Sequence, residues 1–190
     1  MTSRDTPTTL HPALDQGAGP PPIPMALQHL STVAGLVVPW ITARRTDGRV
    51  LFGAVDHHRL HTCLRERRCG VCGQALQDRL VLMMRLSDLP LRCTSEPPLH
   101  PWCAAYSRTA CPMLHGRMRH YRASPPAADD TTLPAPDTAA RLGAAAEPWF
   151  SVWITDYALV THHGTPAAAY RDDQVVRIRP VTGGPAGSPG

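Results

Sequence analysis

Lysine and asparagine are both missing from this 190-residue chain, and aromatic residues make up only 5% of it. Long apolar runs are missing as well, since none approaches the ~20 residues of a helix that crosses a membrane. Residues 1–24 lack the apolar stretch of a signal peptide and carry Asp5 and Asp15 instead. We therefore expect a cytoplasmic protein without a membrane segment. In that compartment, close cysteines more often bind metals or catalyse reactions than form disulfides.

Proline and glycine, by contrast, are abundant, with 21 and 14 copies. With alanine and polar residues, they dominate three stretches that show no hydrophobic periodicity. These stretches predict a disordered N-terminus, a low-complexity linker and a disordered tail, at residues 1–28, 123–148 and 181–190. Two segments of folded structure remain, a zinc-binding module at 29–122 and a β-hairpin-like segment at 149–180.

Alternating apolar residues predict several strands. Residues 37–55 alternate around a break at residues 46–48, Thr-Asp-Gly, which favours a β-hairpin. Residues 78–93 predict either a second hairpin or one apolar strand followed by a loop. Two further apolar stretches after residue 148 also predict strands.

Two short helices complete the predicted α+β fold. In residues 56–67, Asp56 is the candidate N-cap. The apolar face of this helix carries Leu60, Cys63 and Leu64. Residues 101–111 suit a second helix, because Pro101 occupies the first position, where its missing N–H is tolerated.

Two cysteines separated by two residues, Cys69 and Cys72, follow the first helix. A tight turn can direct both sulfurs to one metal, and Gly70 and Gly73 allow the backbone to fold close to them. Zinc requires four tetrahedral nitrogen or sulfur ligands, so a second pair is needed.

His100 and Cys103 provide that pair at the start of the second helix. Unpaired N–H groups and the helix dipole favour a thiolate at this position. A turn, an intervening hairpin and two ligands at a helix start are the treble-clef arrangement. We therefore predict one structural zinc bound by Cys69, Cys72, His100 and Cys103.

Other roles for the cysteines remain open. A redox pair would open a helix beside a parallel strand, but Gly73 and Gln74 follow the pair without such a pattern. Cys93 competes with His100, because it would complete an all-thiolate site. Cys111 lies eight residues after Cys103, ~12 Å along a helix, too far for the same zinc.

Cys63 is most simply a small buried hydrophobe. A second metal is the alternative, bound by Cys63, Cys111 and one of His57, His61 and His115.

No catalytic site is predicted. Treble clefts occur in nucleases named for a His-Asn-His motif, which need a general-base histidine between the two ligand pairs. Residues 74–98 contain no histidine, and the chain contains no asparagine. Four protein ligands also leave zinc no open position for a substrate. We therefore expect a non-catalytic protein.

Basic charge concentrates around the predicted zinc site. Residues 44–124 hold 14 arginines and six acids, a balance of +8, whereas the rest of the chain is at −4. Phosphate neutralisation dominates nucleic-acid affinity, so Arg65, Arg67 and Arg68 beside the cysteine pair are candidate nucleic-acid contacts. The alternatives are a solvated face that offsets the thiolate charge, or a protein-interaction or scaffold role without nucleic acid.

The cysteine and histidine spacing resembles that of a family of small uncharacterised proteins from Streptomyces-like actinobacteria and their phages. The resemblance covers roughly residues 33–120 and is looser after 149. The matching elements are Cys63, Cys69-x2-Cys72-Gly73, His100-x2-Cys103-Ala104 and Cys111-Pro112. The resemblance implies the same zinc ligands and implies no activity. Some members are labelled cell envelope biogenesis proteins, which no signal, barrel or peptidoglycan-binding pattern in this sequence supports.

Overall fold

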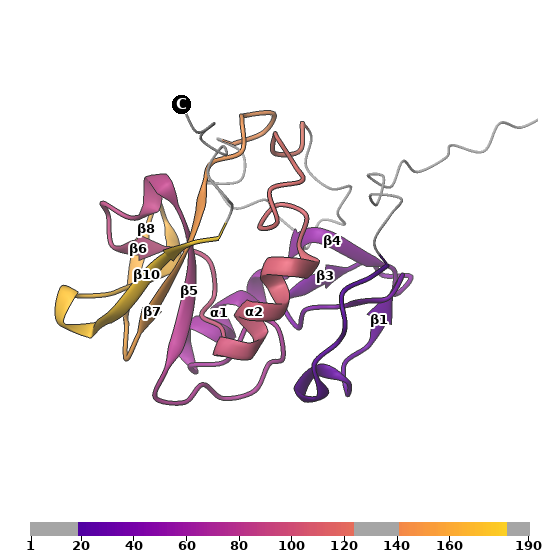
Figure 1. The fold of residues 1–190 in the computed structure, drawn as a ribbon, viewed down its shortest axis with the longest axis horizontal. Coiled ribbons are helices and arrows are strands. Elements are labelled where there is room, and N and C mark those ends of the chain that lie inside the picture. The colour runs from indigo at the N-terminus through magenta and orange to yellow at the C-terminus, as the bar shows by residue number, and fades with distance from the viewer. Residues whose placement is uncertain (1–18, 124–140, 182–190) are drawn as a thin grey trace, which may run out of the picture.

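The structure of the protein is a computed structural model, and it describes residues 19–123 and 141–181. Within these residues the chain forms two α-helices and ten short strands in four small antiparallel sheets, so the predicted mixture of helices and strands is confirmed. Figure 1 places the sheets that contain β5 to β10 on one side, the two helices in the middle, and β1 to β4 on the other side. Neither described helix is long and apolar enough to cross a membrane.

The N-terminal part contributes two hairpins. The first joins β1 (Thr32–Val33) to β2 (Leu36–Val37), and the second joins β3 (Thr42–Arg44) to β4 (Val50–Val55). The second hairpin is the one predicted, and its turn contains Gly48 in the left-handed region at φ +83°. A glycine favours this turn because it has no Cβ to clash in that conformation.

The predicted disordered N-terminus needs a correction. A 3-10 helix, η1 (Met25–Leu27), precedes β1, and Leu27 is completely buried in the core. Burial of this apolar side chain stabilises the order of a proline-rich segment that has no periodicity of its own. Residues 1–18 of the same prediction lie outside the described part of the chain.

Helix α1 (His57–Arg65) begins as predicted, with the Asp56 side chain accepting a hydrogen bond from the Arg59 N–H at 3.1 Å. This bond satisfies one of the otherwise unpaired donors of the first turn. The predicted apolar face is also confirmed, because Leu60, Cys63 and Leu64 are its buried residues.

The central sheet has the order β10-β7-β5 and joins distant parts of the sequence. Strand β5 (Leu80–Arg85) is buried along its whole length and pairs with β7 (Trp149–Ile154), which in turn pairs with β10 (Val175–Pro180). Of the two alternatives for residues 78–93, the structure therefore has the single apolar strand followed by a loop.

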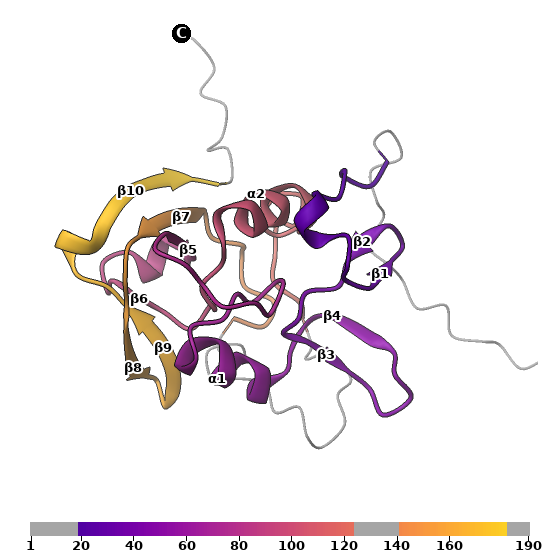
Figure 2. The ribbon, with the colours of Figure 1, turned by 90° about the horizontal axis from the view of Figure 1, so that it is seen from below.

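Alternate residues of β5 face two different cores. Val81 and Met83 belong to the core that includes α2 (Pro101–Ala110). Leu80, Leu82 and Met84 belong to the core that includes α1. Figure 2 shows the same separation, with α2 near β5 and β7 and α1 toward β8 and β9. One strand thus divides the protein into two packed regions.

A second sheet, in the order β6-β9-β8, closes the α1 side. The hairpin of β8 (Ala158–His162) and β9 (Thr165–Ala169) pairs with β6 (Cys93–Thr94) through Cys93 and Ala169. Segments 29–122 and 149–180, which the sequence suggested as separate units, therefore share two sheets and contribute side chains to both cores.

The predicted linker 123–148 is described only at its ends. Its last residues lie antiparallel to the segment after α2, since the Tyr121 N–H donates to Ala144 O at 2.9 Å and the Ala146 N–H donates to Arg119 O at 2.8 Å. Residues 141–148 therefore belong to the folded structure, which corrects this part of the prediction. Residues 124–140 lie outside the described residues.

Candidate metal centre

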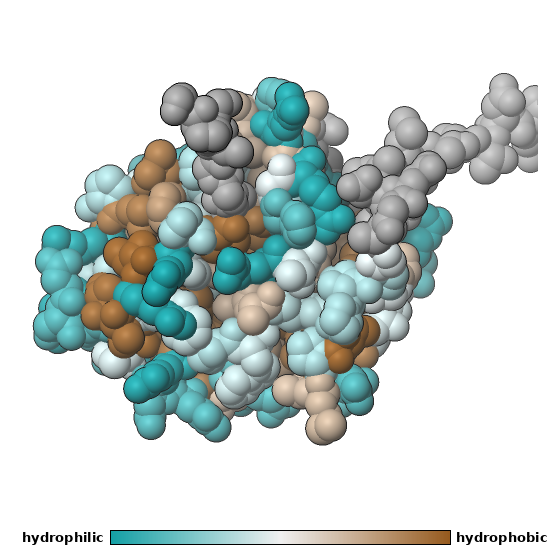
Figure 3. All heavy atoms as spheres, viewed as in Figure 1, coloured by the Kyte–Doolittle hydropathy of each residue, from teal (hydrophilic) through white to brown (hydrophobic). Residues whose placement is uncertain are grey.

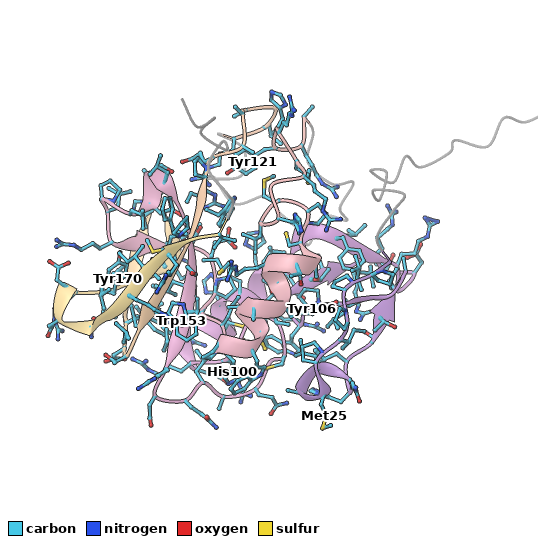
Figure 4. The ribbon with its side chains drawn as sticks, in the orientation of Figure 1. Met25, His100, Tyr106, Tyr121, Trp153 and Tyr170 are labelled. Carbon is cyan, nitrogen blue, oxygen red and sulfur yellow. The ribbon has the colours of Figure 1, made fainter. Side chains whose placement is uncertain are left out.

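Four potential ligands meet between α1, β5 and α2. Cys69 and Cys72 lie in the turn after α1, whereas His100 and Cys103 lie at the start of α2. All four are buried, and one ligand atom from each lies within 4.8 Å of the others. Figure 4 labels His100 at the start of α2, with Tyr106 further along the same helix. The structure thus brings together the four residues that the spacing predicts.

The turn that carries Cys69 and Cys72 is tightly hydrogen-bonded. The Gly73 N–H donates to Cys69 O at 2.8 Å, and the Cys69 N–H donates to Gln74 O at 2.8 Å. Gly73 has a φ of +72°, and a Cβ there would lie 2.8 Å from Cγ of Trp40. A Cβ on Gly70 would lie 2.5 Å from Cγ of Pro97. Both positions therefore require glycine. Gly73 adopts a left-handed backbone conformation and packs against Trp40, whereas Gly70 packs against Pro97 without space for a Cβ.

The second ligand pair is positioned by a short antiparallel bridge. Val81 and Leu99 exchange two backbone hydrogen bonds of 2.9 Å, which fixes the chain immediately before His100. His100 is the extended N-cap residue of α2, and Pro101 occupies the tolerated first position as predicted. Cys103 follows within the first turn, so both side chains reach the same side of the helix start.

The ring of His100 is held in one orientation. Nε2 lies 2.9 Å from the carbonyl oxygen of Ala75, and Nδ1 lies 3.3 Å from Sγ of Cys72. Because a carbonyl can only accept, Nε2 carries the proton and donates it. The lone pair of Nδ1 is then directed toward the sulfurs, which is the arrangement of a metal-binding histidine whose other nitrogen is bonded to a backbone carbonyl.

Trp102 supports the same ring from the outside. Its indole is stacked on the imidazole of His100, with 4.5 Å between ring centroids and 8° between planes. Trp102 is itself 40% exposed, so it forms the solvent side of the site. This contact was not predicted, and the one signal for it in the sequence is the position of Trp102 between the two ligands.

The three thiols strongly perturb one another. Hydrogen bonds from the Cys103 and Cys72 thiols lower the pKa of Cys69 far below its ordinary value. Hydrogen bonding to Cys69 and Cys72, together with burial, raises the pKa of Cys103 far above its ordinary value. Only one sulfur can thus hold a negative charge easily in this buried space. A bound dication removes that conflict, because each sulfur then ligates as a thiolate. The donor set therefore fits a soft divalent metal.

The turn is also tied to the rest of the protein. The Trp40 N–H donates to Val71 O at 2.8 Å, and the Ile41 N–H donates to Gly70 O at 3.2 Å. Arg68 donates from Nη1 to Gly73 O at 3.3 Å, which places a positive charge beside the thiols. The centre therefore joins the N-terminal hairpins, β5 and α2 at one point.

The remaining cysteines lie elsewhere. Cys93 is in β6, opposite Ala169, and does not belong to the cluster. Of the two candidates for the remaining ligand, the cluster contains His100. Cys63 is completely buried in α1, where burial raises the pKa of its thiol to about 12. Cys111 is the C-cap of α2. The described residues contain no second group of His, Cys, Asp or Glu with metal-binding spacing, including around His57, His61 or His115.

Comparisons with family models, curated proteins and solved structures found no match for this chain.

Proposed function

We propose that the protein is a non-catalytic zinc protein, in which one zinc bound by Cys69, Cys72, His100 and Cys103 stabilises the fold. The observation that carries this proposal is the convergence of four buried ligand atoms, with Nδ1 of His100 directed among them by the bond from Nε2 to Ala75. Three thiolates and one imidazole are a ligand set that favours zinc over hard cations.

The arrangement supports a treble-clef-like module. A cysteine turn, the Val81–Leu99 bridge and the ligands at the start of α2 follow one another in the required order. The chain between the bridge residues is longer than a simple hairpin, because it contains most of β5 and all of β6. We infer that this insertion joins the module to the two larger sheets.

A structural role fits the burial and the ligand count. Zinc in structural sites takes four protein ligands in a tetrahedral shell, and these four side chains would supply all of them, which would leave no position for a substrate or an activated water. Zinc in such sites contributes an apparent binding energy of ~10–16 kcal/mol, which becomes folding energy when the free site does not exist in the unfolded chain.

The metal content of the purified full-length chain tests the proposal. Elemental analysis should give about one zinc per chain, and cobalt substitution should produce the visible spectrum of a tetrahedral site with thiolate ligands. His100→Ala should lose most of the metal. Cys93→Ser is the matched control, since Cys93 is buried but outside the cluster, and it should retain the metal.

Two results would overturn this proposal. The first is a protein that is fully folded yet contains no metal. The second is a reversed ranking, in which Cys93→Ser loses zinc and His100→Ala keeps it. Cys111→Ser should leave the metal content unchanged in either case, because its thiol lies at the far end of α2.

A further inference from the structure

The arginines beside the metal centre are largely occupied by the protein itself. Arg67 forms an ion pair with Asp156 and donates to Tyr157 O at 2.9 Å. Arg68 forms an ion pair with Glu66 at 2.9 Å. With Arg65 included, this group has three arginines against two acids, a local balance of +1. A surface with this little excess charge attracts a phosphate backbone weakly.

A more strongly charged surface lies at the β3–β4 hairpin and the segment that follows α2. We define the hairpin arginine face as Arg44, Arg45, Arg49, Arg119 and Arg122. The neighbouring acid in the hairpin is Asp47, which accepts from the Arg49 N–H and forms ion pairs with Arg45 and Arg49. The face therefore has a balance of +4. Residues 112–123 contribute no acid, and their His120 is exposed.

Two contacts hold the two parts of this face together. Arg122 donates from Nη2 to Phe52 O of β4 at 2.7 Å. Gly53 lies under the same guanidinium, since a Cβ there would be 3.3 Å from Nη2. The glycine thus leaves room for the arginine to lie against the strand. Arg119 is three residues away on a segment whose backbone is paired with residues 144–146.

The exposure and the dimensions of the face suit a polyanion. Arg44, Arg49, Arg119 and Arg122 are all exposed. Arg49 directly precedes β4 and lies three residues before Phe52, a span of ~10 Å in extended chain. Duplex DNA presents about six phosphates over ~10 Å of its axis. In Figure 3, hydrophilic side chains gather above α2 in the region of this segment.

We propose that the hairpin arginine face binds the phosphate backbone of nucleic acid, and that the arginines beside the metal centre do not form the main contact. Recognition is through charge, so affinity depends on phosphate density and not on base sequence. The proposal goes beyond the structural role of the metal and does not depend on which metal is bound.

A salt titration of the full-length, metal-loaded protein against duplex DNA and single-stranded RNA tests this proposal. The slope of log affinity against log salt for wild-type protein and duplex should be about −4, near 0.9 per phosphate neutralised. The variant Arg44→Gln/Arg49→Gln/Arg119→Gln should flatten the slope by about 2.7 and weaken binding equally for different sequences. Arg122 is left in place because it anchors the segment to β4.

The matched control is Arg65→Gln/Arg67→Gln/Arg68→Gln, which removes the same formal charge from the metal side. It should change the slope by less than one. Circular dichroism and the Tm of both variants show whether each is folded. An equal change in both triples, or a larger change in the control, would overturn the proposal. So would a failure of wild-type protein to bind at low salt, or tighter binding to anionic lipid vesicles than to nucleic acid.

Discussion

The side chains on the two faces of β5 pack into two cores that differ in composition. On one face, Val81 and Met83 pack with Cys69, Cys72 and Cys103, so this core surrounds the metal ligands and we name it the metal core. On the other face, Leu80, Leu82 and Met84 pack with aliphatic side chains of α1, β7 and β9 and with Tyr157 and Tyr170, and we name it the aliphatic core. The metal core contains three buried thiols that perturb one another, whereas the aliphatic core is mainly apolar and its Tyr157 hydroxyl is satisfied by Leu64 O. One small protein thus combines a core built around a candidate metal centre with a core built mainly from apolar side chains.

Removal of the metal should have the largest effect and should separate the two cores. Cys103→Ser or a strong chelator should eliminate the ~10–16 kcal/mol contribution of the site. Hydrogen exchange should then show loss of protection in α2 first, while β8 and β9 stay protected longer. Simultaneous loss in both regions at one rate would show that the two cores are a single cooperative unit.

Leu82→Ala should damage the aliphatic core and leave the metal in place. Leu82 is completely buried, so the cavity should lower the free energy of unfolding by ~2–5 kcal/mol. Urea denaturation measures the loss, and elemental analysis should still find one metal per chain. Leu86→Ala is the control, because Leu86 is 50% exposed and its replacement should change stability by no more than ~0.5 kcal/mol. Metal loss in Leu82→Ala would contradict the separation of the cores.

The two cores should respond to opposite ends of the pH scale. Burial raises the pKa of Tyr157, in the aliphatic core, to about 12 from its ordinary 10.0, and its hydroxyl donates to Leu64 O at 2.7 Å. A raised folded-state pKa stabilises the protein fully below pH 10, and this contribution is lost as the pH rises toward about 12. The metal core should fail in acid instead, because protons compete with the metal for the thiolates.

Stability measured between about pH 9 and 12 checks the alkaline half of this prediction. Tyr157→Phe should lower the free energy of unfolding by ~1 kcal/mol at neutral pH and should reduce the alkaline loss. An unchanged alkaline profile in Tyr157→Phe would assign the loss to another group, such as the Cys63 thiol, whose pKa burial also raises to about 12.

The smallest expected effect concerns the start of α1. Asp56→Ala removes the acceptor of the Arg59 N–H and should lower the free energy of unfolding by ~1 kcal/mol. The loss of stability should affect the aliphatic core, because α1 packs there through Leu60 and Leu64. The metal content should not change. His58→Ala is a suitable control because His58 is exposed on the same helix. A larger loss in the control than in Asp56→Ala would exclude the cap as the cause.

Features of short range could be predicted from the sequence. The Asp56 cap, the Pro101 helix start, the hairpin turn at Gly48 and the spacing within each ligand pair all depend on a few residues around a turn or a helix end. The order of residues 19–28 could not be predicted. Their composition is that of a disordered segment, and they fold because Leu27 is buried and Ile23 packs among residues distant in sequence.

The sequence by itself determined the proximity within each ligand pair, because two intervening residues keep Cys69 near Cys72 and His100 near Cys103. The tertiary structure brought the two pairs together, through contacts such as the Val81–Leu99 bridge. The tertiary structure decided the pairing of β5 with β7 and of β6 with β9. It also decided which arginines are paired within the protein, since Arg67 meets Asp156 only after the sheets assemble. Such contacts join residues tens of positions apart. They depend on the burial of whole faces, which a local pattern of residue types does not specify.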